Sequence, residues 1–243
     1  MKVKIRLITL GQIPAGFNKK VIKKHKSSVY QLIGDIENFA LNSDSDGASW
    51  EYSDELLSKQ IKENFAGDIL IAISNIPLED NYYTRRLSGN RVVFTFHEIK
   101  DFLILENIPL ENIVFRLLYG YTLVYKRSGD QIPSTINLTN FAHDETRGCL
   151  FDMNGLKNDI IYSCVKPIIC SDCKERLKKE NVSNDMITKV EKEIKSFNKR
   201  RYYVIVDLIK SNPILAIFIS SLTAIILGAI GSILGSIFYE YLK

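Results

Sequence analysis

The chain has 243 residues, four cysteines and a net charge of +4 at neutral pH. With its apolar C-terminal segment set aside, about 180 residues remain, enough for one domain with a substantial core. Much of the positive excess lies beside that apolar segment, where attraction to anionic lipid explains it more simply than nucleic acid does. A nucleic-acid partner is therefore not expected.

Apolar patterns predict the elements of the first half of the domain. Val3–Leu10 alternates charged and apolar residues, which is typical of a strand with one solvated face. Apolar residues recur at helical spacing over residues 28–41, which predicts a helix there. Further predicted elements are a short strand at 48–52, a helix at 54–65 capped by Ser53, and a strand at 69–73 that is apolar throughout and suits burial on both faces.

The second half is predicted to add a strand and several helices. Residues 77–89 are predicted to be a polar connecting segment, 91–96 a strand, and 97–106 either a strand end or a short helix. Pro109 starts a helix at 110–126 with one apolar face. The turn dipeptide Asn154-Gly155 predicts a hairpin between 149–152 and 159–163, and helices are expected from Cys170 and over 183–195. This order of elements predicts an α/β fold with a mixed sheet.

The four cysteines, Cys149, Cys164, Cys170 and Cys173, fall in one short window. In a reducing cytosol such clustering argues against structural disulfides. Cys170 and Cys173 are three residues apart at a predicted helix start, so both sulfurs can approach one tetrahedral ion to about 2.3 Å. With Cys149 and Cys164 they complete an all-thiolate set for structural zinc, and His143 is a spare ligand. Buried thiols without metal and a redox pair are the alternatives, since the spacing matches no standard zinc finger.

The segment after Lys210 is predicted to span a membrane. No acidic or basic residue and no histidine occurs before Glu240, so a helix here can cross a hydrocarbon core of about 30 Å. A buried core helix is the alternative, but such helices rarely run this long without a charge. Asn212 and Pro213 supply a side-chain cap and a first helical residue.

The residues that flank the span predict its orientation. Basic residues precede it at Lys195, Lys199, Arg200, Arg201 and Lys210, and only Lys243 follows it. The positive-inside rule then places the N-terminal part in the cytoplasm of a single-pass cell-membrane protein. Residues 1–8 are not expected to act as a signal peptide, because Arg6 interrupts the apolar run. The predicted division is a cytosolic domain at 1–182, a juxtamembrane helix at 183–210 and an anchor at 211–243.

Small residues within the span predict self-association. Gly228, Gly231 and Gly235 lie near one stripe of a helix, and Gly231 and Gly235 have the spacing at which two membrane helices approach closely. A homo-oligomer in the lipid bilayer is therefore expected.

The order of motifs over residues 68–177 resembles that of archaemetzincin-like zincins. The matching features are a strand ending at Ile73, an edge strand at 92–96, a helix opening with Pro109-Leu110-Glu111-Asn112, then Gly148-Cys149, Met153 and Cys170-x-x-Cys173. The resemblance implies a zincin-like domain with a cysteine-bound structural zinc at the later cysteine pair. That family carries HExxH on the helix and a third histidine after it. Here the helix reads RLLYGYTLVY from Arg116, so the resemblance implies a degenerate domain without catalytic zinc.

Two classes of function follow. The first is a membrane-anchored binding or signalling module without catalysis; bacterial membrane effectors of antiviral defence share this plan of a cytosolic sensor and a membrane segment. The alternative is a metal-dependent, peptidase-like hydrolase whose ligands include His97, Glu98, His143 and Asp144 with the cysteines. His97 and Glu98 do not form HExxH, because Asp101 stands where the second histidine is needed. A plain membrane-tethered scaffold also fits. The ligand is not predicted.

Overall fold

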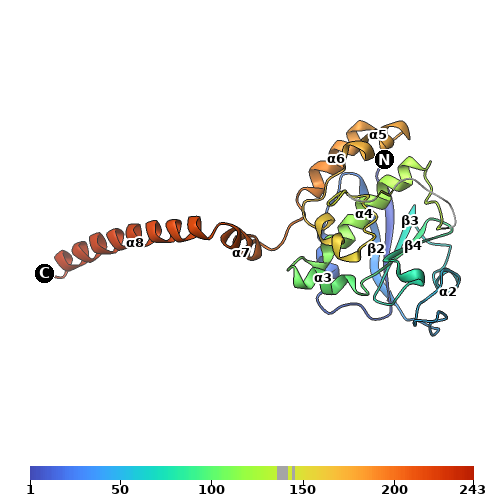
Figure 1. Cartoon of the computed structure of the whole chain (residues 1–243), viewed down its shortest axis with the longest axis horizontal. Helices are drawn as coiled ribbons and strands as arrows, with labels where there is room; N and C mark the ends of the chain where they lie inside the picture. Colours follow the sequence, from blue (N-terminus) through green and yellow to red (C-terminus); the bar gives the residue numbers. More distant parts are fainter. Residues whose placement is uncertain (136–141, 144–145) are drawn as a thin grey trace. The chain divides into compact units, whose positions relative to one another are not determined.

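The computed structural model describes residues 1–135, 142–143 and 146–243, which form two compact units, Met1–Asn198 and Lys199–Lys243. The first unit is built on a five-stranded sheet with the order β2-β1-β3-β5-β4 (Figure 1). All neighbouring strands are parallel except β4 and β5, which are antiparallel. The strands are β1 Val3–Leu10, β2 Tyr30–Phe39, β3 Ile69–Ser74, β4 Thr84–Leu87 and β5 Arg91–Thr95. The predicted α/β class with a mixed sheet is confirmed.

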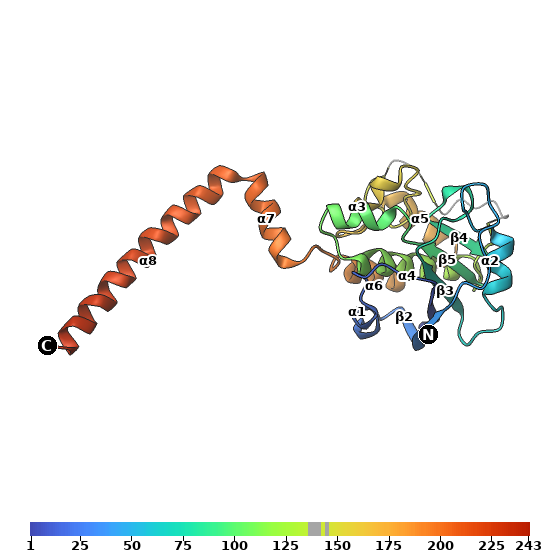
Figure 2. The same ribbon diagram turned by 90° about the horizontal axis from the view of Figure 1, so that it is seen from below.

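Helices lie on both faces of this sheet (Figure 2). In the first unit they are α1 Lys19–Lys24, α2 Asp54–Gln60, α3 Ile99–Leu105, α4 Leu110–Arg127, α5 Ser171–Lys179 and α6 Asn184–Ile194, with short 3-10 helices at Glu79–Asn81 and Lys157–Ser163. Alternate residues of the central strand β3 belong to two cores. Ile69, Ile71 and Ile73 pack in the larger core with α4, whereas Leu70 and Ala72 pack with α2. The prediction that this strand is buried on both faces is confirmed.

Residues 28–41 were predicted to be a helix, and this prediction is wrong. Their backbone pairs in parallel with β1 as the edge strand β2, with a register shift between Arg6 and Ile8. Gly34 lies near that shift at φ +67°, a left-handed conformation that a helix does not accept. As an edge strand with one open side, β2 keeps many exposed polar residues, so it lacks the regular alternation that marks a half-buried strand.

Three smaller predictions also need correction. The segment 77–89, predicted to be a polar connection, contains β4, whose side chains alternate between partly buried and buried. Residues 48–52 form a turn, and only Tyr52 makes an isolated bridge, to Leu78. The predicted hairpin is absent from the described residues, because 159–163 belong to a 3-10 helix. Residues 97–106, predicted to be either a strand end or a short helix, contain the helix α3.

The compact unit extends beyond the predicted boundary at residue 182. Helix α6 buries Ile187, Val190 and Ile194, and Phe197 follows it into the same core. The Phe197 carbonyl accepts a hydrogen bond from the Lys166 amide at 2.7 Å. The segment predicted to be juxtamembrane is therefore divided, with α6 in the first unit.

The second unit consists of α7 Arg201–Ser211 and α8 Pro213–Tyr241. Helix α8 has a mean hydropathy of 2.4 in its most apolar window and is long enough to cross a membrane. Pro213 is at its start, as predicted. The Asn212 side chain does not cap it, because its amide donates to the Leu208 carbonyl of α7 instead.

Candidate metal centre

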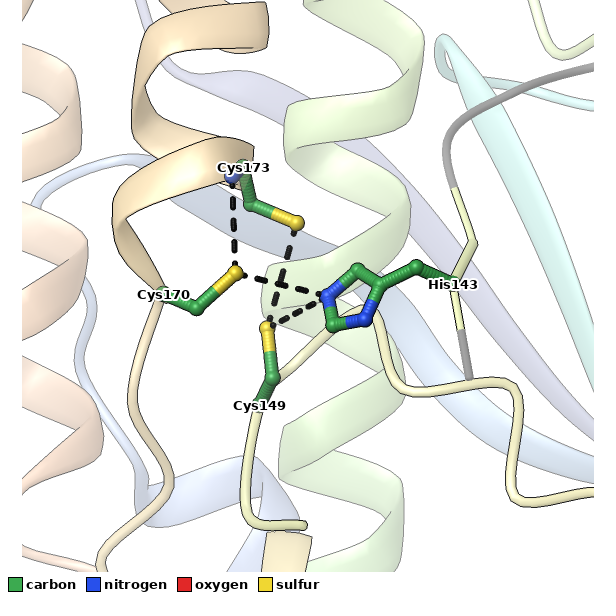
Figure 3. A group of neighbouring side chains, drawn as sticks. All are labelled: His143, Cys149, Cys170 and Cys173. Atoms are coloured by element: carbon green, nitrogen blue, oxygen red, sulfur yellow. Dashed lines mark hydrogen bonds between the residues drawn. The ribbon is translucent and has the colours of Figure 1, made fainter. Parts of the chain in front are cut away.

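Four side chains that can bind a metal meet beside α5. They are His143, Cys149, Cys170 and Cys173, and one ligand atom from each lies within 4.8 Å of all the others (Figure 3). Three of the four cysteines predicted as zinc ligands are brought together in this way. The fourth, Cys164, is not part of the group, and His143 takes its place.

The distances within the group fit a tetrahedral zinc ion. Ligands at about 2.3 Å for sulfur and about 2.0 Å for nitrogen lie about 3.5 to 3.8 Å from one another. The sulfurs of Cys149 and Cys173 are 3.9 Å apart. The His143 Nε2 is 3.3 Å from the Cys149 sulfur and 3.4 Å from the Cys170 sulfur. The donor set is of the Cys3His type, which is compatible with zinc binding.

Short backbone pairings hold the three ligand-bearing segments together. The His143 amide donates to the Phe151 carbonyl, and the Met153 amide donates back to the His143 carbonyl. The segment around Cys149 pairs with Ile168 through hydrogen bonds of 2.7 and 2.9 Å. These pairings place the histidine and the first cysteine opposite the start of α5, which supplies the other two.

Hydrogen bonds of the sulfur atoms link the two cysteines at the start of α5 to each other and to Cys149. Cys170 is the N-cap residue, and its sulfur accepts the Cys173 amide at 3.5 Å. Interaction between the neighbouring sulfurs lowers the pKa of Cys149 to about 5 and raises the pKa of Cys173. Zinc binding would displace the protons that remain on the three thiols.

Cys164 has a different environment. It is fully buried, and burial raises the pKa of its thiol to about 12, although the nearby Arg116 acts in the opposite direction. Its backbone carbonyl accepts a hydrogen bond from the Asn112 side chain at 2.8 Å. Cys164 is therefore a neutral core thiol.

Of the residues that the hydrolase alternative adds, His143 joins this group, whereas His97 and Glu98 do not. Glu98 forms an ion pair with Lys157 at 2.8 Å, which contributes to lowering the pKa of its carboxyl. His97 and Glu98 are outside the only metal-ligand group found among the described residues. Asp144 lies outside the residues that the structure describes.

Comparison with known proteins gives one similar solved structure. No protein-family model matches the chain, and no curated protein matches it. An archaemetzincin from Methanopyrus kandleri is similar in structure, with 15% sequence identity over 74% of this chain and 95% of that one, at a TM-score of 0.42. It belongs to the family that the sequence resembles.

Proposed function

We propose that the chain is a non-catalytic binding and signalling module, stabilised by one zinc ion and held on a membrane by α8. The Cys3His group carries this proposal, because its four protein donors complete a tetrahedral shell. Catalytic zinc sites usually have three protein ligands and keep a position open for water. A zinc ion held here would stabilise the fold without activating a substrate.

The membrane part of the proposal rests on α8 and its flanks. The helix is long and apolar enough to span, and the basic residues before it favour a cytoplasmic first unit. The glycines of α8 favour assembly of several copies in the bilayer. An oligomerising membrane effector, such as those of bacterial defence systems, has this plan.

The hydrolase alternative requires a metal with an open coordination position. The four protein donors leave no open coordination position, which argues against the hydrolase, and His97 is not part of the donor set. We expect His97→Ala to leave both the zinc content and any cellular activity within a few-fold of the wild type. Loss of activity in this variant would favour the hydrolase.

The experiment compares two buried cysteines in the full-length protein. Cys173 is 2% exposed and Cys164 is 0% exposed, so replacement by Ala removes a similar buried thiol from each. Zinc is measured in detergent-purified protein, together with its thermal stability. We expect about one zinc per chain in the wild type and in Cys164→Ala, and loss of zinc in Cys173→Ala.

Metal binding at such a site contributes directly to the free energy of folding. Cys173→Ala should therefore unfold at a much lower temperature than Cys164→Ala. Equal zinc content in the two variants, or no zinc in wild-type protein purified without chelators, would contradict the proposed site.

A further inference from the structure

A cavity of about 360 Å³ lies between β4, α4 and the segment that carries His143 and Cys149. Arg116 and Gly120 of α4 line it, as do Tyr83 before β4 and Phe151 beside the metal centre. We infer that this cavity binds the oxyanion, a carboxylate or a phosphate, of a small ligand with a flat apolar body, and that Arg116 is its main anchor. The inference deepens the proposed binding role by naming a class of ligand.

Arg116 is a buried cation without a counter-ion in the described part of the chain. The residue is only 4% exposed, and none of the ion pairs among the described residues includes it. One guanidinium nitrogen, Nη2, donates to the Asp152 carbonyl at 2.9 Å, whereas Nε is buried and has no hydrogen-bond partner among these residues. A buried charge is costly unless it is paired, so the site is suited to receive an anion.

Two further arginines and one carboxylate are among the described residues that line the cavity. Arg86 points to the α4 side of the sheet, and its guanidinium donates to the Pro133 carbonyl at 2.7 Å. The Arg85 guanidinium is bound by Asp54 at 2.8 Å, so its charge is balanced by that carboxylate. Asp152 is the acidic residue among the described lining residues, and its carboxylate accepts the Asn154 amide at 3.0 Å.

The walls and the size of the cavity define the body of the ligand. Tyr82, Tyr83, Tyr121 and Phe151 provide flat apolar surfaces, and the Arg116 guanidinium lies 5.8 Å from the centre of the Tyr83 ring. A volume of about 360 Å³ is near the lower end of the range for small-molecule sites. Gly120 leaves this space open, since a Cβ there would contact only Leu150, at 3.9 Å. A ligand with one aromatic or similar flat ring therefore fits.

The test measures binding of simple probes to the full-length protein in detergent at constant ionic strength. Benzoate and phenyl phosphate present the two oxyanions, benzamide is the neutral analogue of benzoate, and inorganic phosphate lacks the apolar body. We expect saturable binding of benzoate or phenyl phosphate, with a raised unfolding temperature, and much weaker binding of benzamide and inorganic phosphate. The better of the two aromatic anions identifies the oxyanion.

Two variants separate the anchor from the fold. Arg116→Met should weaken anion binding about tenfold or more, because a hydrogen bond to a charged group is worth about 1.5 to 3 kcal/mol. Arg147→Met is the matched control, since Arg147 is exposed and pairs with Asp159 outside the cavity. Gly120→Leu fills the cavity and keeps Arg116, so it should also abolish binding and carries the test if Arg116→Met does not fold.

The proposal is overturned if neither aromatic anion binds saturably, if benzamide binds as well as benzoate, or if folded Arg116→Met and Gly120→Leu bind like the wild type. Zinc content and membrane association are measured in the same samples. If both are normal while anions fail to bind, the ligand class is wrong and the proposed zinc-stabilised membrane module stands.

Discussion

The extent of the first unit gives a prediction that can be worked out from burial. A fragment of residues 1–198 retains α6 and Phe197, whereas a fragment of residues 1–182 lacks them. Ile187, Val190, Ile194 and Phe197 are between 0% and 4% exposed in the first unit. Burying each such side chain contributes about 1.5 to 3 kcal/mol, so the four together contribute about 6 to 12 kcal/mol as an upper estimate.

This sum is comparable to the whole stability of a typical domain, about 5 to 15 kcal/mol. We therefore expect the longer fragment to unfold cooperatively in urea, as followed by circular dichroism, and the shorter one to show no cooperative transition. Both fragments contain all four candidate ligands of the metal centre, so a difference in stability between them is not caused by a missing zinc ligand. A cooperative transition of the shorter fragment at the same midpoint would refute the reasoning.

Two further predictions concern a polar contact of α6 and the membrane helix. The Glu193 carboxylate accepts hydrogen bonds from Tyr119 at 2.5 Å and from the Ser28 amide at 2.8 Å; burial raises its pKa, but these bonds outweigh burial and the pKa is lowered. The ionised Glu193 therefore stabilises the fold above the pKa that it has in the unfolded chain, and this contribution is lost as the pH falls through the lowered pKa of the folded state. In urea titrations, Glu193→Gln should lose less stability over that acidic range than the wild type. Parallel plots of stability against pH for the two proteins would contradict this. In detergent, Gly231→Leu should dissociate an oligomer that Leu227→Ala leaves intact, as measured by mass photometry; a wild type that stays monomeric at every concentration would exclude assembly through α8.

The sequence predicted the elements whose signals are local. The buried strand β3, the helix α4 after Pro109 and the apolar α8 each carry an apolar pattern of the right length and period. Strand β2 was misread because it lies at a sheet edge, where pairing with β1 sets its conformation and burial imposes little pattern. Such non-local pairing overrides local propensity and cannot be read from the segment alone.

The candidate metal centre was predicted only in part, because one of its four ligands is brought in by non-local folding. Cys170 and Cys173 are close in sequence, so their spacing indicated that they bind one metal ion together. The choice between His143 and Cys164 depends on how the segment before α5 folds back, which the spacing does not encode. Arg116 was also missed as a candidate ligand-binding residue, although a single arginine within the apolar stretch of α4 is a signal that could have found it.

The most direct test of the account is the coordination of zinc in the full-length protein, measured by X-ray absorption at the zinc edge. A closed Cys3His site predicts about one zinc per chain with three sulfur ligands at about 2.3 Å and one nitrogen at about 2.0 Å. In His143→Ala, the nitrogen should be lost while the sulfurs remain or the zinc is released. Zinc with a water ligand in the wild-type shell, or a shell of four sulfurs that includes Cys164, would contradict the account.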